Sequence, residues 1–175
     1  MGTPFIGLSL ALALICVPGV GAPAGPFDRS AISYGPALNE ALERAGSGLR
    51  FDLERCGTGP QWECRFSSSR VSIIVDGGRL QTGIGKITIA ADIPKDVPTA
   101  LPDAVVLDAL IALTATMSVL DPDLPPDRRN GMVLSLLESV HGTGYGAERG
   151  IAADYEIGLH REATTLLVIT ATPKP

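Results

Sequence analysis

The sequence predicts a single α+β domain built on one largely antiparallel sheet of about six strands, with helices packed on one face. Three observations lead to this fold class. The predicted elements follow in the order helix, four strands, two helices, two strands. Short hairpin connections join most of the strands, and such connections make neighbouring strands antiparallel. The chain is 45% hydrophobic and 19% charged, a composition that can bury a core and is not typical of disorder.

The first 24 residues are predicted to be a signal peptide. They contain no Asp, Glu, Lys or Arg, and residues 5–17 form an apolar run. The Ala-Pro-Ala sequence at 22–24 matches the small-residue pattern that signal peptidase reads, which predicts cleavage after Ala24. The basic residue that usually precedes the apolar run is missing. The alternative is an uncleaved anchor helix, but the run is shorter than the roughly 20 apolar residues that span a membrane.

Residues 25–175 are predicted to form the single mature domain. Its length is 151 residues once 24 of the 175 are removed, and it keeps the net charge of −5. An acidic chain lacks the basic face that a nucleic-acid binder needs. Cys56 and Cys64 remain as an even pair, which is expected to form a disulfide in the periplasm or outside the cell. A redox-active pair or a metal site is the alternative interpretation of these cysteines.

The first half of the domain is predicted to contain one helix and four strands. Gly35 and Pro36 are typical of a helix start, and the apolar spacing after them predicts a helix over residues 36–45. Alternation of apolar and polar residues predicts the strands, which cover residues 49–54, 62–66, 71–75 and 84–89. A tight turn with two central glycines is predicted at residues 76–79, and a bulge or bend is predicted between Gly83 and Gly85.

The disulfide hairpin raises a question of register. If Cys56 lies directly opposite Cys64, the side-chain period of two places Leu53 and Phe66 on opposite faces of the sheet. A bulge in the glycine-rich loop after Cys56 would correct the phase, and we expect this solution. The alternative is that Trp62 and Phe66 cover the second face.

The second half is predicted to contain two helices and two strands. Residues 103–120 carry one continuous apolar stripe, which predicts a helix buried on most sides. A second helix is predicted over 125–141, ending at Gly142, with a glycine-rich loop after it. The strands that follow the loop are predicted at residues 153–160 and 166–169.

The sequence shows no catalytic, cofactor-binding or metal-ligating pattern. The two histidines, His141 and His160, have no partner at a characteristic spacing, and there is no Gly-x-Ser-x-Gly motif. Asp154 is expected on a solvated strand face together with Glu156. Paired acids at 121 and 123 are interpreted as turn and cap residues. The glycine-rich stretches at 83–86 and 142–146 precede no helix, so they are interpreted as loops and not as phosphate cradles.

Three residues are candidates for binding a partner. Trp62 lies at the tip of the disulfide hairpin, where an exposed aromatic side chain could anchor a protein. Arg128 and Arg129 lie in the first turn of a helix, where the helix dipole disfavours cations, and they could dock an acidic partner.

The expected function is that of an exported, non-catalytic domain, without cofactor or mature membrane span, that binds a protein or a small ligand. Binding would use the uncovered sheet face or the Cys56–Cys64 hairpin. One alternative is a small exported hydrolase whose site is assembled from distant residues, with His141, His160 or Asp154 as candidates. Another is a carrier for apolar ligands, with the helix at 103–120 lining the pocket.

Overall fold

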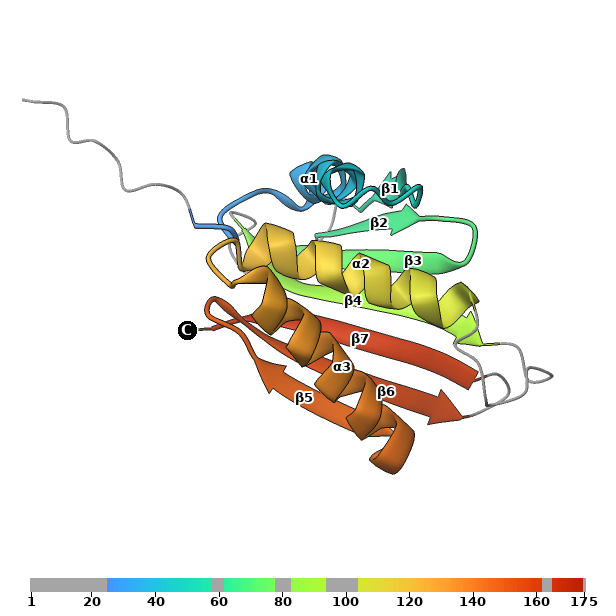
Figure 1. Cartoon of the computed structure of the whole chain (residues 1–175). Coiled ribbons are helices and arrows are strands. Elements are labelled where there is room, and N and C mark those ends of the chain that lie inside the picture. Colours follow the sequence, from blue (N-terminus) through green and yellow to red (C-terminus); the bar gives the residue numbers. More distant parts are fainter. Residues whose placement is uncertain (1–24, 58–61, 78–82, 94–103, 162–164, 175) are drawn as a thin grey trace, which may run out of the picture.

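The described part of the chain forms one seven-stranded sheet with three helices packed on it (Figure 1). The computed structural model describes residues 25–57, 62–77, 83–93, 104–161 and 165–174, so the predicted signal peptide lies outside it. Every strand pair is antiparallel, in the spatial order β1-β2-β3-β4-β7-β6-β5. The elements are α1 (Ala31–Arg44), β1 (Asp52–Cys56), β2 (Glu63–Ser67), β3 (Val71–Gly77), β4 (Ile84–Ile93), α2 (Ala104–Leu120), α3 (Pro126–Thr143), β5 (Tyr145–Arg149), β6 (Ala153–Arg161) and β7 (Thr165–Pro173).

The helices share one face of the sheet, as the sequence predicts. Figure 1 shows α2 and α3 crossing in front of the central strands, with α1 above the end formed by β1 and β2. Alternate residues of the central strands are buried beneath them, such as Ile73 in β3, Ile89 in β4 and Ile169 in β7. The side chains between them, such as Thr88 and Thr170, belong to the other face, which no described helix covers. The α+β fold class is therefore confirmed, with seven strands in place of six.

Helix α1 begins at Ala31, earlier than the predicted start at residue 36. Gly35 lies within the helix because the helix approaches Phe66 closely: a Cβ atom at Gly35 would overlap the Phe66 ring. Pro36 is also inside the helix, where it lacks an N–H group to donate to the carbonyl of Ile32. The interpretation of Gly35 and Pro36 as a helix start was wrong because a glycine needed for close packing resembles a glycine at a cap.

The pairing register of the disulfide hairpin shifts by one residue inside β1. Cys56 lies directly opposite Cys64, and the two form a disulfide. Leu53 nevertheless lies opposite Phe66, because the register shifts between Leu53 and Arg55. The expected bulge in the glycine-rich loop was misplaced. Regular pairing continues past Cys56, where the backbone N–H of the next residue donates to the carbonyl of Glu63 at 2.8 Å, so the phase changes earlier in the strand.

The connection between β3 and β4 is longer than the predicted turn at residues 76–79. Lys86 lies opposite Asp76, and Ile84 lies opposite Gly77, so residues 78–83 join the strands. The register shift at this end of the pair makes Gly85 the extra residue, which confirms the bend predicted between Gly83 and Gly85. Residues 78–82 lie outside the described part of the chain.

The seventh strand is β5, in a segment that the sequence analysis assigned to a loop. Helix α3 continues past Gly142 and ends at Thr143, with Gly144 as its cap at φ 79°. Strand β5 follows immediately and pairs with β6. A Cβ atom at Gly146 would lie 2.9 Å from that of Ser139, so this glycine lets β5 approach α3 closely. In the sequence, a glycine that permits close packing within a strand looks like a loop residue, so β5 was not predicted.

Candidate functional site

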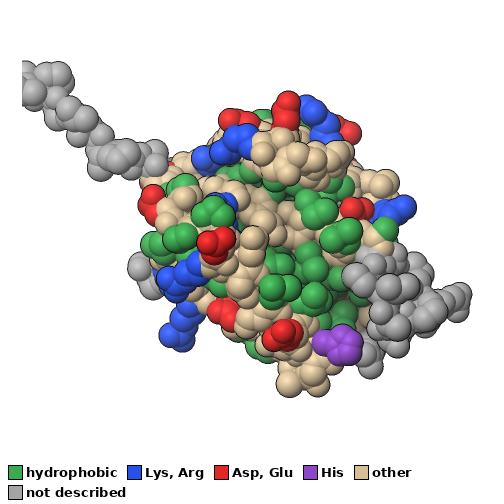
Figure 2. Space-filling view, viewed as in Figure 1, with side chains coloured by type: hydrophobic (Ala, Val, Ile, Leu, Met, Phe, Trp, Pro, Cys, Tyr) green, Lys and Arg blue, Asp and Glu red, His purple; other side chains and the backbone are tan. Residues whose placement is uncertain are grey.

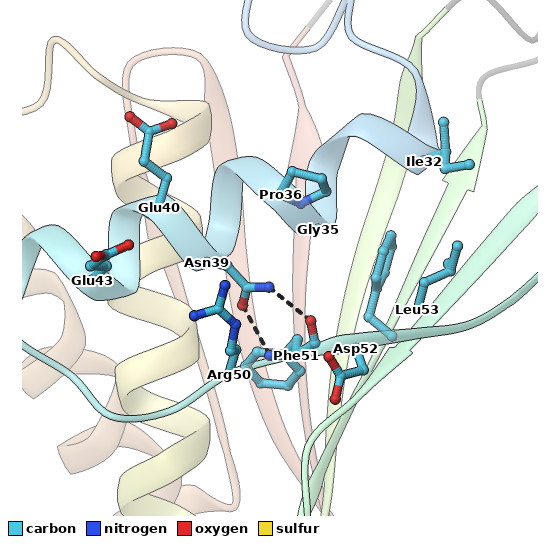
Figure 3. A pocket seen from close by; sticks show the side chains of 11 residues that line it. Ile32, Gly35, Pro36, Asn39, Glu40, Glu43, Arg50, Phe51, Asp52 and Leu53 are labelled. Atoms are coloured by element: carbon cyan, nitrogen blue, oxygen red, sulfur yellow. Dashed lines mark hydrogen bonds between the residues drawn. The ribbon is translucent and has the colours of Figure 1, made fainter.

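A cleft of about 450 Å³ opens between α1 and the start of β1 (Figure 3). One wall is a face of α1, and the other wall consists of residues 50–53, which lead into β1. Figure 3 shows that the cleft has two chemically different ends. The side chains of Ile32 and Leu53 lie at one end, and those of Glu43 and Arg50 lie toward the other.

The first end of the cleft is apolar and open to solvent. Ile32 is 47% exposed and Leu53 is 48% exposed. The ring of Phe66, which is only 2% exposed, also lines the cleft and belongs to the core. Large aliphatic side chains that stay half exposed beside a buried ring offer apolar area that a partner could remove from water.

The charged side chains along the rest of the cleft are predominantly acidic. The charged side chains that line the cleft are Glu40, Glu43, Asp52 and Arg50, a net charge of −2. Glu40 forms an exposed ion pair with Arg44, which does not line the cleft, at 4.0 Å. Within the described residues no ion pair engages Glu43 or Asp52. These two carboxylates are therefore available to a cationic partner.

The Asn39 side chain holds the two walls together. Its amide nitrogen donates to the carbonyl of Phe51 at 2.8 Å, and its amide oxygen accepts from the N–H of Phe51 at 2.9 Å. A neighbouring strand would make the same pair of bonds with an edge residue. The bonds fix the segment before β1 against α1, and the Cys56–Cys64 disulfide fixes the other end of β1 to β2. The cleft is thus preformed.

Strand β1 is an edge of the sheet, and its outer side pairs with no other strand in the described chain. Two features oppose the addition of another strand there. The register shift after Leu53 interrupts regular pairing, and Asp52, Glu54 and Arg55 place exposed charges along the edge. Bulges and charges of this kind are the usual protection of sheet edges. The cleft, and not the edge backbone, is therefore the accessible binding feature of this region.

None of the three predicted partner-binding residues lines the cleft, and Trp62 directly precedes β2 whereas Arg128 and Arg129 belong to α3. Trp62 is half-buried next to the end of β3, where its carbonyl accepts from the N–H of Gly77 at 2.5 Å. Arg128 is exposed on the first turn of α3. Arg129 is partly buried and donates to the Ser118 hydroxyl on α2, so it ties the two helices together. The partner-binding roles of Trp62, Arg128 and Arg129 stay predictions.

The candidate catalytic residues are not brought together. His141 is exposed in the last turn of α3, and His160 is exposed on the face of β6 that points away from the helices. Among the described residues, neither histidine has a carboxylate partner within hydrogen-bonding distance. Asp154 pairs instead with Lys174 at 3.6 Å. No group of three or more His, Cys, Asp or Glu side chains in the described ranges could hold a metal ion.

One buried polar cluster has no counterpart in the sequence analysis. Asp121 is 1% exposed, and its carboxylate accepts from the Tyr155 hydroxyl at 2.8 Å and from the N–H of Ala152. Burial and the bond to Asp121 raise the pKa of Tyr155. Burial also raises the pKa of Tyr34, whose hydroxyl lies 2.6 Å from that of Thr116. The backbone of Asp121 forms the predicted turn, but its side chain joins that turn to the β5–β6 hairpin.

The described surface also has a second hollow and several exposed hydrophobic side chains. A hollow of about 550 Å³ at the β2–β3 turn is lined mainly by residues 67–72, and the Ser68 hydroxyl there is engaged by its own loop. Figure 2 shows hydrophobic side chains reaching the surface over the helices. The large exposed ones are single residues on different helices, Leu107 on α2 and Leu134 on α3. The inner face of α2, including Leu113 and Met117, is filled by core packing.

None of the described helices combines the length and the apolar character of a membrane span. Comparison of the sequence with protein-family models, with curated proteins and with solved structures finds no match. The geometry of the cleft is therefore the basis for assigning a function.

Proposed function

We propose that this protein is an exported, non-catalytic domain that binds a segment of another protein in the cleft between α1 and β1. The observation that carries the proposal is the pair of half-exposed aliphatic side chains, Ile32 and Leu53, beside the ring of Phe66. Burying such side chains contributes about 25 cal/mol per Å² of apolar area, which gives a partner a reason to bind there.

A protein segment fits the cleft better than a small ligand does. Sites for small molecules bury about 70–90% of the ligand surface. Here Ile32 and Leu53, one from each wall, are themselves half exposed, so a small molecule would stay in contact with water at that end. A side chain that projects from a partner can fill the cleft while the rest of the partner covers the rim.

Export is the second part of the proposal. The Cys56–Cys64 disulfide supports it, because structural disulfides persist in oxidising compartments. The apolar run and the small-residue motif before Gly25 support it independently. Mass spectrometry of the protein collected outside the cytoplasm is expected to show Gly25 as the first residue and a mass two hydrogens below that of the reduced chain. A mature protein that retains residues 1–24 would contradict cleavage.

Peptide selection tests the binding function. A library of random peptides displayed on phage is selected on the wild-type protein, and the enriched peptides are synthesised and titrated. We expect their affinity to fall at least about tenfold on Leu53→Arg and on Ile32→Arg, because both variants fill the apolar end with charge. Leu134→Arg is the matched control, since Leu134 is 60% exposed on α3 and far from the cleft lining.

Two results would overturn the proposed function. One is the failure of repeated selections to enrich any peptide. The other is enrichment of peptides that bind the Leu53→Arg and Leu134→Arg variants equally well. Enriched peptides that are recovered cleaved would favour the hydrolase alternative.

A further inference from the structure

We infer that the protein segment bound by the cleft is cationic, with one aliphatic side chain flanked by lysine or arginine. This inference rests on the proposed function and specifies the chemistry of the partner. It follows from the arrangement of apolar and charged groups along the cleft. It also follows from the features that oppose the addition of a further strand to the free edge of β1.

The apolar end of the cleft selects the central residue of the partner. Ile32 and Leu53 are aliphatic, and Pro36 on α1 adds a further apolar side chain to the lining. The Phe66 ring is in the core beside them. A branched aliphatic side chain such as leucine would contact these four groups on one side while the body of the partner covers its other side, whereas a hydroxyl would find no side-chain hydrogen-bonding group among them.

The carboxylates along the cleft select the flanking residues. Glu43 and Asp52 lack ion-pair partners in the described structure, and the net charge of the lining side chains is −2. Arg50 is the single cation among them. Lysine or arginine beside the aliphatic residue would pair with the free carboxylates, and an acidic flank would be repelled by them. Charge complementarity of this kind gives specificity and raises the association rate.

The partner inserts a side chain and does not add a strand. The bulge at Glu54 and the charges along β1 oppose strand pairing, and Asn39 already occupies the backbone groups of Phe51. Binding is therefore expected to depend on the side chains of the partner and to be insensitive to its backbone N–H groups.

Synthetic peptides test the inference directly. The reference probe is a capped Gly-Lys-Lys-Leu-Lys-Lys-Gly peptide, titrated by isothermal calorimetry against the full mature domain. Three comparison probes replace the lysines by glutamate, the leucine by serine, or the backbone N–H groups of the flanking residues by N-methyl groups. We expect the glutamate and serine probes to bind at least about tenfold more weakly and the N-methylated probe to bind within about threefold of the reference.

Variants of the protein test whether the carboxylates of the cleft contribute to peptide affinity. Replacing both free carboxylates, Glu43→Gln with Asp52→Asn, is expected to weaken the reference probe about three- to tenfold, since each exposed ion pair contributes little. The same double variant is expected to strengthen the glutamate probe. Asp123→Asn, an exposed acid in the α2–α3 turn, is the matched control and should leave both affinities unchanged.

The outcomes distinguish this inference from the proposed function. If the glutamate or serine probe binds as tightly as the reference and is still lost on Leu53→Arg, the cleft binds peptides but the inferred chemistry is wrong. If N-methylation abolishes binding, the partner adds a strand and the insertion mode is wrong. If the reference probe does not bind, or binds Leu53→Arg unchanged, the inference fails, and selection of peptides from the random library decides whether the proposed function survives.

Discussion

Replacement of Asp121 by alanine is expected to be among the most damaging substitutions in the domain. The Asp121 carboxylate is 1% exposed and satisfies two donors, the Tyr155 hydroxyl and the N–H of Ala152. Leaving a buried donor without an acceptor costs about 1–3 kcal/mol. Tyr155 is fully buried and Ala152 is partly exposed, so the expected loss in unfolding free energy is about 2–4 kcal/mol. Single domains have a total of only about 5–15 kcal/mol.

Urea denaturation followed by circular dichroism measures this loss through linear extrapolation. Asp123→Ala is the matched control in the same turn, and because Asp123 is exposed its effect is expected to stay within about 0.5 kcal/mol. Tyr155→Phe removes one of the two donors, so the loss caused by Asp121→Ala should be smaller in that background. An Asp121→Ala variant as stable as the Asp123→Ala control would refute the assignment of a structural role to this carboxylate.

Three further predictions concern the fold. Gly35→Ala places a methyl group against the aromatic ring beneath α1, and a drop of about 1–3 kcal/mol in unfolding free energy is expected in the same urea assay; an unchanged midpoint would contradict the close approach. Replacing Cys56 and Cys64 together by serine opens a short loop and should cost about 2–3 kcal/mol, with no further loss on adding a reductant. Because the pKa values of Tyr34 and Tyr155 are raised in the folded state, stability is complete below the ordinary tyrosine pKa of 10.0 and should fall as the pH rises above it, by up to about 1.4 kcal/mol per pH unit for each tyrosine; alkaline titration of stability that shows no decline would exclude this linkage.

Local periodicity predicted most of the fold. The apolar stripe of α2 repeats within a single element, and the alternation in β2, β3 and β6 is regular, so each is readable from neighbouring residues. The disulfide followed from the number of cysteines left after the first 24 residues. These predictions hold because hydrophobic spacing and side-chain direction are tied to one another within a helix or strand.

Glycines account for most of the errors in the predicted elements. Gly35 and Gly146 lie inside elements at points where a helix and a strand approach closely, and Gly142 lies inside α3. In the sequence they are indistinguishable from glycines at caps and loops. The close approach involves Phe66 at Gly35 and Ser139 at Gly146, which lie on neighbouring elements, and no local pattern marks either contact.

The cleft itself could not be predicted from the sequence. Its walls meet because the Asn39 amide binds the backbone of Phe51, twelve residues away, and no pattern marks that pairing. Alternation over residues 49–54 puts Leu53 on the same strand face as Phe51, which is buried, whereas Leu53 is half exposed and the register of β1 shifts directly after it. The proposed cleft borders the disulfide hairpin, but α1 and residues 50–53 line it and Trp62 does not.

NMR chemical-shift mapping locates the binding site without any substitution in the protein. The reference lysine-leucine peptide is titrated into isotope-labelled protein. If the peptide binds in the cleft between α1 and β1, the largest shifts cluster on the backbone amides of Ile32, Asn39 and Leu53, with small shifts on β6 and β7. Shifts centred instead on the uncovered face of the sheet, at Val168 and Thr170, would show that the cleft is not the binding site.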